Sequence, residues 1–214
     1  MMSAAGITAP SRGSKGEHTR QSILKHALAL SSQVGLGGLT IGHLAEQLGL
    51  SKSGLFAHFR SKEALQIQVL QYAAEQFVQR VVRPALTAPR GEPRVRAIFE
   101  RWSEWGMHRP LPGGCVFVAA ASELDDQPGP VRDQLVRTQR EWLDFLATAS
   151  RMGVEKGEFR AEADADQFAH DLYGIMLAFH HAHRLLGDPA ADTRARRAFE
   201  ALISSARAPK EVPR

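Results

Sequence analysis

Residues 40–65 read TIGHLAEQLGLSKSGLFAHFRSKEAL. The apolar residues from Ile41 to Leu48 recur three and four positions apart, which puts them on one face of a short helix. Gly49 suits the left-handed turn that ends such a helix, because glycine has no Cβ to clash there. The run therefore predicts a short helix, a tight turn and a second short helix that begins near Ser51.

Two short helices joined by a tight turn have the spacing of a helix-turn-helix, whose second helix lies in the major groove of DNA. Thr40 and Ser51 have the chemistry of N-caps. The helix starts that they mark present backbone N–H groups, which bind phosphate readily. Lys52, Arg60 and Lys62 supply the charge that displaces counterions from DNA.

The formal net charge of +4 is unevenly distributed along the chain. Residues 1–62 hold seven Lys and Arg against two acidic residues, a net charge of +5. Residues 63–214 hold 20 Lys and Arg against 21 acidic residues, a net charge of −1. A basic segment on a nearly neutral body is the pattern expected where one small module meets a polyanion.

The composition excludes several classes of protein. With 43% hydrophobic and 23% charged residues in 214, the chain is neither disordered nor collagen-like, and its length fits one to two domains. No run approaches the ~18 apolar residues of a membrane span. A single cysteine, Cys115, cannot form an internal disulfide, so we expect a reducing, cytoplasmic setting and no membrane partner.

The remaining segments also have the periodicity of helices, and no strand pattern competes. The predicted fold class is all-α, with an N-terminal three-helix helix-turn-helix domain at residues 17–62 and a larger C-terminal helical domain at residues 63–207. Residues 1–16, which lack the apolar segment of a signal peptide, are expected to be a disordered arm, and residues 208–214 a tail. The predicted helices cover residues 21–34, 41–48, 52–59, 62–84, 94–108, 115–124, 131–156, 165–186 and 190–206.

Residues 19–65 closely resemble the TetR family of bacterial transcriptional regulators. The resemblance rests on the order of residues 40–65, including its Phe-Arg-Ser-Lys-Glu-Ala-Leu ending, and on Arg20 to Gly35 upstream. Two positions differ from the family pattern. Ser31 stands where an aromatic residue is usual, and Phe56 replaces a tyrosine whose phenol could bond a phosphate.

The resemblance implies roles for single residues of the helix-turn-helix. Thr40 and Lys62 correspond to phosphate contacts, and Lys52 and His58 to groove-facing positions. Leu55 and Phe59 are expected in the core instead. The predicted DNA-binding residues are Thr40, Ser51, Lys52, Ser53, Gly54, Phe56, His58 and Lys62.

The run Gly113-Gly114-Cys115 resembles the start of the ligand domain in one branch of the same family. The family implies a homodimer formed by the last two helices and a pocket for a small-molecule effector. Aromatic residues and methionine at helical spacing are candidates to line that pocket, although such stripes also occur in ordinary cores. The predicted effector-binding residues are Trp102, Trp105, Phe117, Trp142, Phe145, Tyr173, Met176 and Phe179.

Other chemistry has little support. His180 and His183 could share a helix face as metal ligands do, but a polar pocket lining or an interface histidine accounts for them as well. Cys115 could be a redox-sensing thiol, yet its neighbours favour a buried, inert one. No nucleophile elbow, HExxH, P-loop or GxGxxG is present, so we predict no enzyme activity, no metal and no cofactor.

The sequence thus predicts a ligand-responsive DNA-binding transcriptional regulator, a repressor that a small molecule releases from a palindromic double-stranded DNA operator. Its expected partners are that operator, an effector and a second copy of the chain. Two alternatives stay open: a helical small-molecule-binding protein or enzyme without a DNA role, and an architectural protein that binds DNA without sequence preference.

Overall fold

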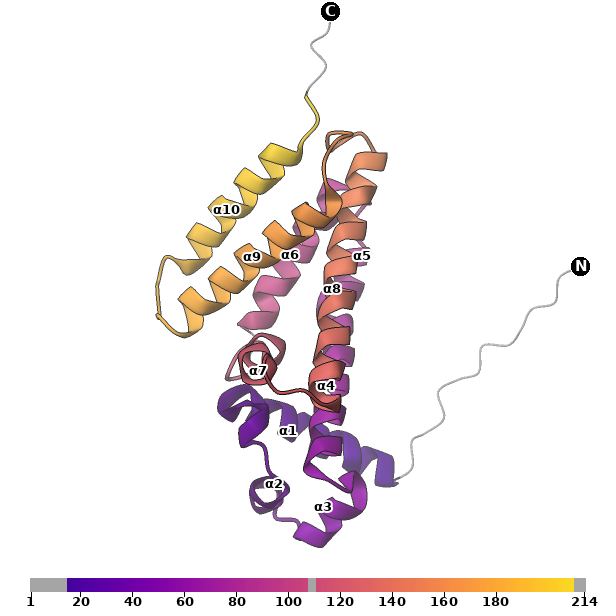
Figure 1. Cartoon of the computed structure of the whole chain (residues 1–214), viewed down its shortest axis with the longest axis vertical. Helices are drawn as coiled ribbons and strands as arrows, with labels where there is room; N and C mark the ends of the chain where they lie inside the picture. Colours follow the sequence, from indigo (N-terminus) through magenta and orange to yellow (C-terminus); the bar gives the residue numbers. More distant parts are fainter. Residues whose placement is uncertain (1–14, 108–110, 210–214) are drawn as a thin grey trace, which may run out of the picture.

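The computed structural model describes residues 15–107 and 111–209. Within these ranges the regular structure is helical, and the only strand-like feature is an isolated bridge between Phe159 and Arg207. The molecule is elongated, with α1, α2 and α3 at one end and the long helix α8 running away from them (Figure 1). The predicted all-α class is therefore confirmed.

The helices α1 (Lys15–Gly38), α2 (Ile41–Leu48) and α3 (Lys52–Phe59) form the N-terminal domain, called the head below. Each helix turns an apolar face inward, so the three helices share one core. Leu55 and Phe59 are buried in it as predicted. The helix α1 begins at Lys15, so the predicted arm at residues 1–16 is wrong at its last two positions. Glu17 lies in the first turn of α1, where a carboxylate favours the helix dipole. Residues 1–14 lie outside the described ranges.

The predicted single helix at residues 62–84 is divided in three. The helix α4 spans Lys62–Phe77, a π-helical turn η1 spans Val78–Val82, and α5 spans Arg83–Leu86. Pro84 at the start of α5 has no N–H, and its ring would clash with the carbonyl four residues earlier in an α-helix. The wider π turn before it removes that conflict.

Five helices make the body. They are α6 (Glu92–Gly106), α7 (Val116–Leu124), α8 (Pro130–Glu155), α9 (Ala165–Arg184) and α10 (Ala191–Ala206). The helix α9 packs between α8 and α10, and α9 and α10 lie side by side in Figure 1. The predicted boundaries are within about two residues of these, except that His108, the last residue predicted for α6, lies outside the described ranges.

Ion pairs and one ring stack fix α10 against α6. The rings of Phe99 and Phe199 stack with centroids 4.2 Å apart. Arg96 bridges Glu92 and Glu200 at 2.8 and 2.5 Å. The Arg207 guanidinium also bonds Glu92 and holds the pKa of that carboxyl below its usual value.

The predicted tail is wrong at its first residue. The amide of Ala208 donates to the carbonyl of Glu158 at 2.9 Å, so the ordered body continues one residue beyond 207. This bond extends the bridge between Phe159 and Arg207. Residues 210–214 lie outside the described ranges.

The head and body meet where the loop before α7 crosses α1. The Gly113 amide donates to the Ser32 hydroxyl at 3.1 Å. A Cβ on Gly113 would lie 1.4 Å from the Ser32 carbonyl oxygen, which is backbone and cannot rotate away. Only glycine fits this crossing.

We expect Gly113→Ala to lower the free energy of unfolding by about 1–3 kcal/mol, because the added methyl forces the loop off α1. Chemical denaturation with urea measures this change. Gly42→Ala is the matched control, since a Cβ there would be 3.4 Å from Lys52 Cε, an ordinary contact. Equal stability of the two variants would show that the crossing tolerates a side chain.

Candidate DNA-binding and effector sites

Three side-chain caps shape the helix-turn-helix. Thr40 Oγ1 accepts from the His43 amide at 3.1 Å, Ser51 Oγ from the Gly54 amide at 3.1 Å, and Ser61 Oγ from the Ala64 amide at 3.0 Å. Each cap satisfies one of the unpaired donors at a helix start. Gly49 ends α2 with φ of 62°, in the left-handed region that favours glycine.

The start of α3 is the exposed surface of the head. Ser51, Lys52, Ser53 and Gly54 are all exposed, and Phe56 keeps 49% of its surface accessible. His58 is half-buried and Thr40 is exposed at the start of α2. Four of the predicted residues, Ser51 to Gly54, thus lie together on the cap and first turn of α3, and Phe56 and His58 follow on the second turn.

Lys62 has a second partner that the sequence did not indicate. Its Nζ donates to the Gly37 carbonyl at 2.6 Å, and Gln66 Nε2 donates to the Leu36 carbonyl at 2.6 Å. Both bonds tie α4 to the end of α1. The predicted phosphate contact of Lys62 stays a prediction, and it would need this side chain to share or leave the Gly37 carbonyl.

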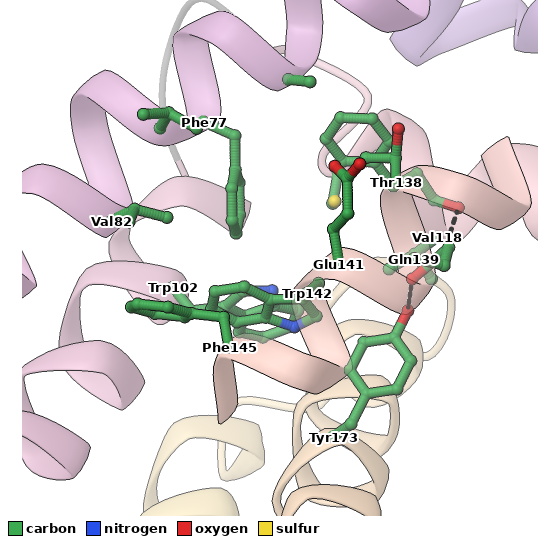
Figure 2. Close-up of a pocket in the computed structure, with 14 residues that line it drawn as sticks. Phe77, Val82, Trp102, Val118, Thr138, Gln139, Glu141, Trp142, Phe145 and Tyr173 are labelled. Carbon is green, nitrogen blue, oxygen red and sulfur yellow. Dashed lines mark hydrogen bonds between the residues drawn. The ribbon is translucent and has the colours of Figure 1, made fainter. Parts of the chain in front are cut away.

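A cavity of about 220 Å³, partly open to solvent, lies between the helices of the body. Pockets for small molecules are typically about 300–1,000 Å³, so this one suits a compact ligand. Residues from α4, η1, α6, α7, α8 and α9 contribute to it (Figure 2). Its lining comprises Ala74, Phe77, Val78, Val82, Trp102, Cys115, Phe117, Val118, Thr138, Gln139, Glu141, Trp142, Phe145 and Tyr173.

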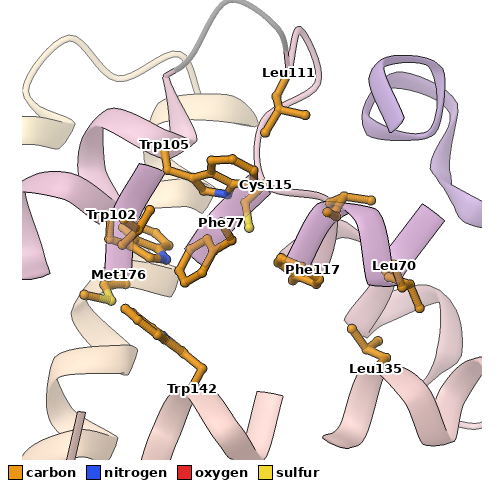
Figure 3. Close-up of a cluster of buried hydrophobic side chains, with 14 of the residues drawn as sticks. Leu70, Phe77, Trp102, Trp105, Leu111, Cys115, Phe117, Leu135, Trp142 and Met176 are labelled. Atoms are coloured by element: carbon orange, nitrogen blue, oxygen red, sulfur yellow. The ribbon is translucent and has the colours of Figure 1, made fainter. Parts of the chain in front are cut away.

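Five of the eight predicted effector-binding residues line this cavity, namely Trp102, Phe117, Trp142, Phe145 and Tyr173. The other three are buried beside it. Trp105 makes a T-shaped contact with Phe77, and Met176 is fully buried (Figure 3). Phe179 makes an edge contact with Trp102. A stripe at helical spacing identifies the apolar face of a helix but not which part of that face borders a void.

The sequence prediction missed the contributions of α4, η1 and the polar side of α8. Val78 and Val82 reach the cavity from the π turn, and Glu141 reaches it from a helix position next to Trp142. Phe77 stood out as an apolar residue of its helix, yet no local signal distinguished it from core. Only the packing of α4 against α8 places these side chains together.

The polar groups of the cavity are mostly paired. The Tyr173 hydroxyl donates to Gln139 Oε1 at 2.6 Å, and Gln139 Nε2 donates to the Phe117 carbonyl at 3.3 Å, as Figure 2 shows. Burial raises the pKa of Tyr173 to about 12, so its phenol is neutral near pH 7. Thr138 Oγ1 donates to the Gln134 carbonyl within α8.

Cys115 is buried beside this cavity, and burial raises the pKa of its thiol. A redox-sensing cysteine needs thiolate character and access to solvent. Neither condition holds here, so the buried, inert alternative describes Cys115.

The helix α7 connects the cavity to the head. Phe117 and Val118 line the cavity from its first turn. At its other end, the Glu123 carboxylate accepts from the Leu36 amide at 3.2 Å and from the Gly37 amide at 2.7 Å. A ligand that displaced α7 would therefore also displace the end of α1, which Glu123 holds through these two bonds.

His180 faces the same joint from α9. Its Nε2 is buried without a hydrogen-bond partner in the described part of the chain, and it lies 3.0 Å from where a Gly114 Cβ would be. Burial lowers the pKa of His180, and Arg184, His183 and His181 lower it further. His183 instead stacks on Phe179.

Neither a metal site nor a membrane helix is found in residues 15–107 and 111–209. No group of three or more His, Cys, Asp or Glu side chains is placed to hold a metal ion there. No helix in those ranges is long and apolar enough to cross a membrane.

Comparison with known proteins defines the class of this chain. Residues 23–69 match the family model described as "Bacterial regulatory proteins, tetR family", and residues 91–199 match "Tetracyclin repressor-like, C-terminal domain". The chain belongs to the TetR family of transcriptional regulators.

Three relatives illustrate the similarity. The HTH-type transcriptional repressor KstR2 of Mycolicibacterium smegmatis is 26% identical over 160 residues, which are 74% of this chain and 76% of that protein. A TetR transcriptional regulator from Chloroflexus aurantiacus is 29% identical, with a TM-score of 0.79 over 89% of this chain and 94% of that one. AibR, solved in complex with isovaleryl coenzyme A and operator DNA, shares the fold at 19% identity, with a TM-score of 0.71 over 87% and 98% of the two chains.

His180 makes stability depend on pH. Its folded pKa lies below the unfolded value of about 6.5, so the unfolded chain binds the proton more readily. We expect the free energy of unfolding to fall as pH drops below about 6.5 toward the folded pKa. Above about pH 6.5, His180 should contribute nothing to the pH dependence. His180→Gln should weaken this dependence in urea titrations from pH 5 to 8. His170→Gln, exposed on the same helix, is the control and should retain the full dependence.

Proposed function

We propose that this protein is a transcriptional repressor that binds a palindromic operator as a homodimer and is released by a small molecule. The observation that supports this proposal most directly is the exposed first turn of α3. It presents Lys52, Ser53 and Gly54 immediately after the Ser51 cap. The repressor KstR2 and the operator-bound AibR support this function by similarity. The proposal places the protein in the cytoplasm and gives it no catalytic step.

A dimer fits the outer helices. A helix-turn-helix protein reads two half-sites about 34 Å or a multiple apart, which takes two heads. Leu177 within α9, and Leu185 and Leu186 just after it, keep 37%, 73% and 65% of their surface exposed. Covering such side chains favours association. Two heads would bring about ten positive charges to one duplex, since each carries a net +5 in residues 1–62.

Effector release follows from the arrangement of α7. An effector in the cavity contacts the first turn of α7, whereas Glu123 on the last turn holds Leu36 and Gly37 of the head. The effector must bind better to the arrangement that does not fit DNA, and such coupling is typically about 1–3 kcal/mol.

We expect Lys52→Ala to weaken operator binding and to lower the slope of log affinity against log salt by about 1 per half-site, because one phosphate contact is lost. The operator is first selected from random duplexes with the purified protein, and fluorescence anisotropy then measures affinity between 50 and 300 mM salt. Lys156→Ala, exposed at the end of α8, is the matched control. An unchanged slope for Lys52→Ala would remove this residue from the interface.

We expect Glu123→Ala to lower the free energy of unfolding by about 1–3 kcal/mol, because two backbone donors lose a charged acceptor. Hydrogen exchange of the Leu36 and Gly37 amides should accelerate in this variant. Asp126→Ala removes an exposed carboxylate just beyond α7 and serves as control. Unchanged exchange at both amides in Glu123→Ala would contradict the bridging role.

A further inference from the structure

The charge at the edge of the cavity indicates the class of effector, an inference that rests on the proposed function. Its ionisable lining residues are Cys115, Glu141 and Tyr173. The first and last are neutral near pH 7 because burial raises the pKa of both. No Lys, Arg or His of the described ranges lines the cavity, so the Glu141 carboxylate is its one charge.

Glu141 is an exposed residue at the open edge of the cavity, and it has no partner of its own among the described residues. It makes no hydrogen bond or ion pair within residues 15–107 and 111–209, whereas Glu92, Glu100 and Glu200 in the same body are all held by arginines. Figure 2 shows the Glu141 side chain directed toward the space enclosed by the labelled residues. An acidic group at a cavity without a counter-charge favours a cation there.

The walls favour the same charge. The Trp142 ring contacts Phe77 at 4.8 Å and Phe145 at 5.6 Å between centroids, and all three line the cavity. The faces of aromatic rings attract cations, most strongly when water is excluded. The apolar lining also favours a ligand whose charge sits on a compact hydrophobic body.

An anion would find one free donor at this cavity, Trp142 Nε1, which is buried without a hydrogen-bond partner among the described residues. The Tyr173 hydroxyl and the Gln139 amide already donate to Gln139 and to Phe117. Beyond Trp142 Nε1, a bound carboxylate or sulfonate could gain a donor only by breaking these bonds, and Glu141 would repel it. A neutral ligand meets no such penalty, but it gains nothing from the carboxylate.

We propose that the effector cavity takes a compact hydrophobic cation, such as an aryl ammonium, with Glu141 as its counter-charge and the Trp142 and Phe145 rings as its walls. The ammonium end lies toward Glu141, and the apolar body fills the space toward Phe77. Glu141 is then a specificity-determining residue that selects the charge of the effector.

Three probes of one shape test this proposal on the full chain. Phenyltrimethylammonium, tert-butylbenzene and benzenesulfonate differ mainly in charge, which is +1, 0 and −1. Quenching of tryptophan fluorescence and calorimetry measure their dissociation constants. We expect the cation to bind roughly tenfold or more tightly than the neutral probe, and the sulfonate to bind most weakly.

Variants connect this order to Glu141. Glu141→Gln should weaken the cation about tenfold and bring it level with the neutral probe, whose own affinity should hardly change. Glu155→Gln removes an exposed glutamate from the end of the same helix and should leave all three affinities as they are. Thermal unfolding of each variant checks that it is folded.

The remaining outcomes overturn the proposal. Equal binding of the cation and the neutral probe, tighter binding of the sulfonate, an insensitive Glu141→Gln variant, or no binding of any probe would each do so. Operator affinity is measured separately in the same preparations. Loss of the charge preference with intact operator binding sinks this inference alone, whereas absence of operator binding sinks the proposed function.

Discussion

Hydrogen bonds from two backbone amides of the head to one carboxylate of the body connect the two parts of the molecule. Glu123 on α7 accepts from Leu36 and Gly37 at the end of α1, and Gly113 crosses Ser32 just before α7 begins. These contacts fasten the head to the helix that also borders the cavity. Without them, the head and the body would be two helical units joined by α4, and events in the cavity would have one route fewer to the DNA-binding surface.

The head is the part that sequence could predict. Thr40, Ser51 and Gly49 act on neighbours within four residues, so their caps and turn can be recognised without knowing the rest of the fold. The burial of Leu55 and Phe59 follows from helical periodicity in the same way. Local chemistry of this kind is also what makes the family resemblance recognisable over residues 19–65.

The cavity shows where sequence reasoning stops. Trp102 and Trp105 lie on one turn of α6 with the same periodicity, yet only the former lines the cavity. Which aromatic borders a void depends on how α4, α8 and α9 pack, and these contacts span up to a hundred residues. The hydrogen bonds from Lys62 and Gln66 to the end of α1 could not be predicted either, since a long-range hydrogen bond has no local sequence pattern.

The π turn η1 (Val78–Val82) sets the rotation of the helices that follow it relative to α4. Val78 and Val82, at its ends, line the cavity, whereas the head lies beyond the other end of α4. A π turn holds one residue more than an α turn, and removing that residue would rotate everything downstream by about 100°. A one-residue insertion or deletion here would therefore disturb both the cavity wall and the contacts that Gly113 and Glu123 make with α1, since both residues lie downstream. The register of this turn is thus constrained by the cavity wall and by the junction with the head together.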